Sequence, residues 1–140
     1  MYGDTAVGRK RVAQLREQSG DIRALAARLV SQAEAAPWHG KAADAMRERI
    51  KERANHLRTA AAHHETAAES LAKHLGEVDS LKEAIDTRSR KATTLVEDAR
   101  TRTSEAAPGA AADESDSAVL AFDPPPAGHR DWLTVDLPGL

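Results

Sequence analysis

The chain of 140 residues contains no cysteine, which excludes a disulfide, a thiolate metal site and a cysteine nucleophile. Aromatic residues make up only 3% of the sequence. A β-sandwich or barrel needs β-branched and aromatic side chains to cover its pleated surface, and proteins that bind single-stranded nucleic acid use aromatic rings to stack the bases. These shortages predict an all-α protein that binds no nucleic acid.

Long apolar runs are also missing. No segment approaches the roughly 20 apolar residues of a membrane-spanning helix, and the first residues lack the apolar core of a signal peptide. We therefore expect no stable membrane insertion and no cleaved signal peptide. Residues 1–104 carry 19 Lys and Arg against 15 Asp and Glu, whereas residues 105–140 carry 1 against 7. Neither part has the strongly basic character of a nucleic-acid-binding domain.

What the chain does have is alanine, at 29 positions, and two long apolar patterns with helical spacing. In the first pattern the stripe residues step by three and four, which predicts an amphipathic helix that ends before Pro37. The stripe consists of Val12, Leu15, Ser19, Ile22, Ala26, Leu29, Ala33 and Ala36.

The second pattern begins after Gly40 and keeps a seven-residue repeat for about seven heptads. One row consists of Ala43, Ile50, Leu57, His64, Leu71, Val78, Ile85 and Ala92. The flanking row consists of Ala54, Ala61, Ala68, Leu75 and Val96. Gly76 could stop this helix, but both rows pass through it without a change of phase, which favours one continuous helix over a break.

Between the two patterns stands the sequence Pro37-Trp38-His39-Gly40. Proline stops the first helix and glycine allows the chain to reverse, so the two helices should form an antiparallel hairpin. At about 1.5 Å per residue, a first helix of roughly 30 residues covers about 45 Å. The first helix should therefore end near Leu71 of the second. The rest of the overlong second helix would then need cover from another segment or from a partner.

The Trp-x-Gly turn between two such helices resembles the WXG (ESAT-like) family of small proteins secreted by type VII (ESX) systems. The following run, from Gly40 to Met46, is similar to the Gly-x-Ala-Ala-x-Ala-(Phe/Met) run of type VII secretion-signal domains. The resemblance covers residues 1 to about 100. It implies a dimeric four-helix bundle that travels folded, with Trp38 and Gly40 forming part of the surface that the export machinery recognises.

Pairing is also expected from the residues themselves, because a two-helix hairpin buries a small core. The partner would be a second copy or a sister hairpin, exported with the type VII machinery or with a co-secreted effector. We predict that the pairing interface consists of Leu25, Val30, Met46, Ile50, Leu57, His64, Leu71, Leu75, Val78, Leu81 and Ile85.

One departure from the family is plain. Its export signal, Tyr-x-x-x-Asp/Glu after the second helix, is absent, because the only tyrosine is Tyr2. Either a partner supplies the signal or another terminal segment of this chain does.

The main hypothesis is thus a secreted type VII substrate or export partner. The alternatives are a cytoplasmic coiled-coil adaptor whose tail docks a partner, and a helper module for a separately encoded toxin.

We divide the chain into a hairpin domain (1–104), a disordered acidic linker rich in proline and alanine (105–128) and a C-terminal docking segment (129–140). The last segment holds the only β-like run of the tail, with Trp132, Leu133, Val135 and Leu137 as the docking residues. Such residues dock on a partner or fold back onto the bundle.

Catalytic chemistry is not indicated. The sequence has no glycine-rich phosphate loop, no nucleophile elbow and no histidine pair with the three- or four-residue spacing of a helical metal site on one face. We expect a non-enzyme with no cofactor and no metal, which acts by binding. Under the pairing hypothesis, His64 is a half-buried interface residue, and its protonation in acid could loosen the contact with the partner.

Overall fold

The computed structural model describes residues 5–111 and 113–140, so the first four residues of the predicted hairpin domain lie outside the described part. Its elements are α1 (Thr5–Ala35), α2 (Lys41–Glu105), α3 (Glu114–Leu120) and the 3-10 helix η1 (Arg130–Thr134). The described residues contain no strand, which confirms the all-α prediction. They divide into two compact units, the hairpin unit (5–76) and the tail unit (77–140), and each is described by itself.

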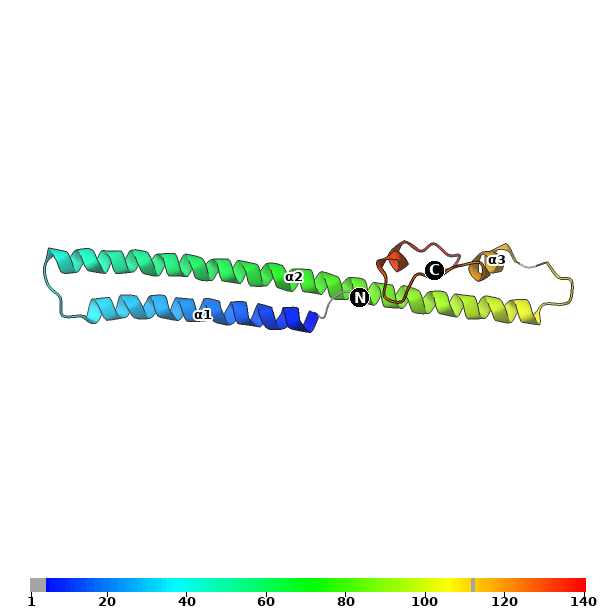
Figure 1. Cartoon of the computed structure of the whole chain (residues 1–140), viewed down its shortest axis with the longest axis horizontal. Helices are drawn as coiled ribbons and strands as arrows, with labels where there is room; N and C mark the ends of the chain where they lie inside the picture. The colour runs from blue at the N-terminus through cyan, green and yellow to red at the C-terminus, as the bar shows by residue number, and fades with distance from the viewer. Residues whose placement is uncertain (1–4, 112) are drawn as a thin grey trace. The chain divides into compact units, whose positions relative to one another are not determined.

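In the hairpin unit, α1 packs antiparallel against the first part of α2 (Figure 1). Each helix buries a row of residues that repeats every seven positions, as expected for two helices that wind around each other. The row of α1 is Val12, Ser19, Ala26 and Ala33, and the row of α2 is Ala54, Ala61, Ala68 and Leu75. The seam between the helices is therefore built mainly from small side chains.

The row of α2 that is buried in this seam differs from the row that the sequence predicts. Ile50, Leu57 and Leu71 of the row with the larger residues are only half-buried, whereas Ala54, Ala61 and Ala68 of the flanking row are fully buried. Small side chains allow two helix backbones to come close, and the closer backbones push larger side chains out to the edges of the seam.

The close approach is clearest at the start of α1. A Cβ atom added at Gly8 would lie 2.6 Å from Leu75 Cδ2. Leu75 is buried because α1, which is 31 residues long, still covers it. The first helix therefore does not run out at Leu71, as its estimated length suggested.

α2 is one continuous helix of 65 residues and passes through Gly76, as the uninterrupted apolar rows predict. An added Cβ at Gly76 would meet nothing within 4 Å, so this glycine serves no close packing. The missing side chain costs helix propensity without ending the helix, because the residues on both sides are strong helix formers.

In the tail unit, the C-terminal segment lies along the last part of α2 (Figure 1). Ile85 and Ala92 of α2 form a small core with Trp132 and Leu137. Phe122, Val135 and Leu140 pack against this core, and the rings of Phe122 and Trp132 meet edge to face with centroids 6.0 Å apart. The row of α2 that α1 does not reach is thus covered by the chain's own tail.

Two features of the tail differ from the expectations. Residues 105–128, interpreted as a disordered linker, contain α3, in which the Asp113 side chain accepts a hydrogen bond from the Ser115 N–H and Asp116 is buried. Residues 131–134 of the β-like run belong to the 3-10 helix η1, and the side chain of His129, just before η1, accepts a hydrogen bond from the Asp131 N–H. α3 contacts α2 through Asp116 and Arg102, and η1 contacts it through Trp132 and Arg88, and composition reveals neither contact.

Candidate functional site

The turn between α1 and α2 presents a tryptophan to solvent. Gly40 has a φ of +95°, a conformation that side-chain-bearing residues rarely adopt, so the turn requires glycine here. The Trp38 N–H donates to the Ala36 carbonyl at 2.8 Å. The Trp38 residue is 46% exposed, although a large aromatic side chain is usually well buried. The backbone of the turn therefore has a defined conformation, while the Trp38 indole remains accessible to solvent.

Arg47, in the second turn of α2, binds this loop. Its Nε donates to the Ala33 carbonyl at 3.2 Å, and its Nη2 donates to the carbonyls of Ala36 and Trp38 at 3.0 and 2.8 Å. Its Nη1 lies 3.4 Å from Asp44 Oδ1. A single guanidinium thus ties the end of α1 and the Trp38 turn to α2.

One face of the hairpin unit collects its larger apolar side chains. Most of these residues follow a member of the buried row by three positions, and Ile50 lies one heptad before Leu57 in the same line. Helical geometry places them to the same side of the buried row. In an antiparallel pair, matching positions on the two helices share one face, and Leu15 and Leu71 indeed pack against the same buried cluster. We call this surface the apolar face. Its half-buried members are Leu15, Ile22, Leu29, Ile50, Leu57, His64 and Leu71.

The opposite side of the seam, the charged face, is mostly ionic. Arg9 and Arg16 of α1 line the same shallow cavity as Ala72 of α2. Further along, the Ser19 hydroxyl donates to Glu65 Oε1 at 2.8 Å, and Arg23 binds both carboxylate oxygens of Glu65 at 3.1 and 2.9 Å. These hydrogen bonds, first from Arg23 and then from Ser19, lower the pKa of Glu65 below its usual value.

The remaining predicted pairing residues are distributed unevenly. Leu25, Met46 and Leu81 are exposed, and Val30 and Val78 are half-buried. Leu75 and Ile85 are buried within the chain, Leu75 under α1 and Ile85 under the tail. These last two residues therefore serve the internal core and cannot also form an exposed pairing surface in this conformation.

His64 accordingly lies on the apolar face among leucines and isoleucines. Its Nδ1 is 2.9 Å from the Ala60 carbonyl, one turn earlier in α2. This hydrogen bond satisfies one ring nitrogen within the helix, so the imidazole can sit in apolar surroundings at low cost.

Of the four predicted docking residues, Trp132 and Leu137 are buried against α2, Val135 is half-buried and Leu133 is exposed. Arg88 of α2 donates to the backbone carbonyls of Trp132 and Val135. The Trp132 indole N–H donates to the Pro126 carbonyl at 3.1 Å. The structure thus uses this segment for intramolecular packing, the fold-back alternative, in place of a free docking segment.

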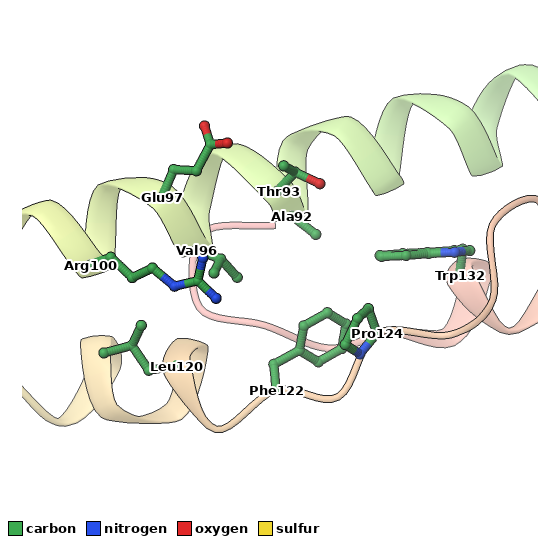
Figure 2. A pocket seen from close by; sticks show the side chains of 9 residues that line it. All are labelled: Ala92, Thr93, Val96, Glu97, Arg100, Leu120, Phe122, Pro124 and Trp132. Atoms are coloured by element: carbon green, nitrogen blue, oxygen red, sulfur yellow. The ribbon is translucent and has the colours of Figure 1, made fainter.

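A cavity of about 260 Å³ lies between α2 and the tail within the tail unit. Figure 2 shows Phe122, Pro124 and Trp132 on the tail side and Ala92 and Val96 on the α2 side, with the Glu97 carboxylate pointing away. The polar groups at its edge form no nucleophile–base pair and no convergent carboxylates. We interpret this cavity as imperfect packing of the tail on the helix.

No group of three or more His, Asp or Glu side chains in residues 5–111 and 113–140 is placed to hold a metal ion. In the same part of the chain, no helix is both long enough and apolar enough to cross a membrane.

Comparisons of this chain with family models, with curated proteins and with solved structures find no match. Any functional assignment therefore depends on the residues and geometry described above, together with the short Trp-x-Gly motif.

Sequence reasoning placed Trp38 and Gly40 in the turn but missed the contacts by which Arg47, Arg88 and Arg102 join separate segments. Arg102 binds the buried carboxylate of Asp116 through Nε and Nη2, with the shortest distance 2.7 Å. Only for Arg47 was there a signal. Proline at position 37 deprives the Ala33 carbonyl of its usual helical donor, which predicts that some other group must replace it.

Proposed function

We propose that this chain is a non-enzymatic pairing protein whose hairpin unit binds a second helical hairpin through the apolar face. The observation that carries the proposal is the separation of the two faces. One side of the alanine seam holds half-buried Leu and Ile residues, and the other holds the Ser19, Arg23 and Glu65 network. Helices that show an apolar stripe on one face bury it against another layer.

The composition of the seam supports the need for a partner. Alanine contributes little buried area, so the contact between α1 and α2 removes less apolar surface from water than a seam of leucines would. The larger side chains that could supply that area stand half-exposed at its edge. A second hairpin laid on the apolar face would complete their burial and form a four-helix bundle.

The finer proposal is that the pair is a type VII (ESX) secretion substrate or export partner of the WXG type. It is supported by the Trp-x-Gly turn between two long helices, by the exposed indole of Trp38 and by the required glycine at position 40. Because the Tyr-x-x-x-Asp/Glu signal is missing, the partner hairpin would supply it. The missing signal also favours one second candidate, a cytoplasmic coiled-coil adaptor that pairs in the same way.

The pairing proposal is tested by sedimentation of the full chain, alone and with any hairpin protein encoded beside its gene. We expect a complex at micromolar concentration. Leu57→Gln should weaken it, because a polar amide would replace an apolar contact. Arg58→Gln should not, because Arg58 is exposed and lies one heptad before Glu65, in line with the charged face. A chain that stays monomeric in both mixtures and melts cooperatively would refute pairing.

Export is tested in an actinobacterium with an active type VII system and in a matched strain in which that system is disrupted. We expect the protein in the culture medium of the first strain only, while a cytoplasmic marker stays inside both. Retention of the protein inside both strains, with pairing intact, would favour the adaptor.

A further inference from the structure

Pro37 leaves a carbonyl at the end of α1 without its usual hydrogen-bond donor. In a regular helix the Ala33 carbonyl would accept a hydrogen bond from the N–H of residue 37, and Pro37 has none. The last turn of α1 also contains no basic residue to offset the negative end of the helix dipole. A donor with a positive charge is needed at this position, and it has to come from outside α1.

Arg47 supplies both the donors and the charge. Its Nε binds the Ala33 carbonyl, and its Nη2 bridges the carbonyls of Ala36 and Trp38, all within 3.2 Å. Its side chain is only 22% exposed, which strengthens these bonds relative to those of a solvated arginine. A cation near the start of α2 is unfavourable for α2 itself, so the position is better explained by the needs of α1 and the turn.

The consequence for Trp38 is a fixed backbone on both sides of an exposed ring. Its N–H is held by the Ala36 carbonyl, and its carbonyl is held by Arg47. A large aromatic side chain that is exposed on a rigid backbone loses little conformational entropy on binding, which is the property of an interface anchor.

We propose that Arg47 is a positioning residue that locks the Trp38 turn in the conformation presented to the protein that recognises this turn in export. The hold of Arg47 on the turn, which we call the lock, is a property of this chain alone, whereas the role of the turn in recognition rests on the proposed function. Lysine cannot replace it, because one ammonium group lacks the planar fork that reaches three carbonyls together.

The lock is tested with 5-fluorotryptophan, which gives separate fluorine-19 signals for Trp38 and Trp132, assigned with Trp38→Phe. In Arg47→Met and Arg47→Lys we expect the Trp38 signal to sharpen and move towards its position in the urea-unfolded chain. Amide exchange at Trp38 should rise about tenfold. The Trp132 signal should stay unchanged, and Arg49→Met, an exposed arginine on the same helix, should alter neither signal.

An unchanged Trp38 signal and exchange rate in both Arg47 variants would overturn the proposal. Loss of helical structure in both variants would also overturn it, since Arg47 would then be needed to fold the hairpin as a whole. The lysine variant keeps the charge at the end of α1, which makes folding the expected outcome.

The recognition role is tested by export of the same variants, with pairing to the second hairpin measured in parallel. We expect Arg47→Lys to reduce export as strongly as Trp38→Ala does, whereas pairing through the apolar face and the melting temperature stay close to those of the native chain. Normal export in Arg47→Lys with a released Trp38 would overturn the recognition role. If Trp38→Ala itself is exported normally, the proposed role of this turn in export fails, while the fluorine spectra still decide the lock.

Discussion

At the scale of single residues, two glycines of the hairpin unit have opposite roles. Gly40 has a φ of +95° with open space around it, so replacing it by alanine adds backbone strain and no clash. We expect Gly40→Ala to lower the free energy of unfolding by about 1–2 kcal/mol. Urea unfolding followed by circular dichroism measures the change.

Gly20 is the matched control for this substitution. It lies inside α1, and an added Cβ would meet nothing within 4 Å. Gly20→Ala should raise the free energy of unfolding by about 0.5–1 kcal/mol, because alanine has the higher helix propensity. Changes of the same sign in the two variants would contradict the left-handed conformation at position 40.

Glu65 connects the stability of the hairpin unit with pH. Arg23 and Ser19 lower its pKa below the usual value of 4.5, so the folded state favours the carboxylate. The resulting stabilisation is complete above the pKa of the unfolded chain and is lost as the pH falls through the lower pKa of the folded chain. We expect Glu65→Gln to flatten the fall in melting temperature between about pH 5 and pH 3.

Glu69→Gln, an exposed carboxylate one turn further along α2, is the control. It should leave the pH dependence of melting close to that of the native chain. If both substitutions flatten the curve equally, the acid sensitivity comes from general charge balance and not from the Ser19, Arg23 and Glu65 network.

At the scale of elements, the distance between α1 and α2 depends on the alanine row. Ala61 is fully buried, and Ala62 beside it is exposed. Ala61→Leu should force the helices apart and destabilise the hairpin unit by about 1–3 kcal/mol, as overpacking does elsewhere. Ala62→Leu should stay within about 0.5 kcal/mol of the native chain. Chemical denaturation of both variants compares them, and an unchanged Ala61→Leu would mean that the seam is loosely packed.

At the scale of the whole molecule, the two units should differ in what stabilises them. Removing residues 106–140 uncovers Ile85 and Ala92, while the described contacts of Val12, Ala68 and Leu75 stay intact. We expect fast amide exchange in residues 85–99 of the truncated chain and native exchange in the hairpin unit. Protection that persists in residues 85–99 would mean that another surface covers this part of α2.

Point variants separate packing from chain length in that experiment. Trp132 is 4% exposed, and Trp132→Ala should cost the tail unit about 3–5 kcal/mol. Leu133, which is among the exposed residues, serves as the control. Leu133→Ala should leave amide exchange in residues 85–99 unchanged.

Sequence alone determined the secondary structure of the hairpin and the position of its turn. Helical periodicity and the Pro37 and Gly40 signals are local, so they predict α1, α2 and the reversal between them without knowledge of packing. The same is true of the uninterrupted helix at Gly76, because apolar rows that keep their phase leave no reason to break it. The exposure of Trp38 does not follow from the sequence, because a tryptophan in this turn could also be buried as a staple of the hairpin end; the structure shows it 46% exposed.

Only the tertiary structure decided which heptad row of α2 faces α1. Adjacent rows differ by a small rotation about the helix axis, so the periodicity of the sequence cannot distinguish them. The tertiary structure also decided the contacts that join distant positions, such as Ser19 with Glu65, Arg88 with the Trp132 carbonyl and Arg102 with Asp116. These pairs depend on the register of one segment against another. That register is set by the shape and volume of all the side chains between the segments, and no local pattern records it.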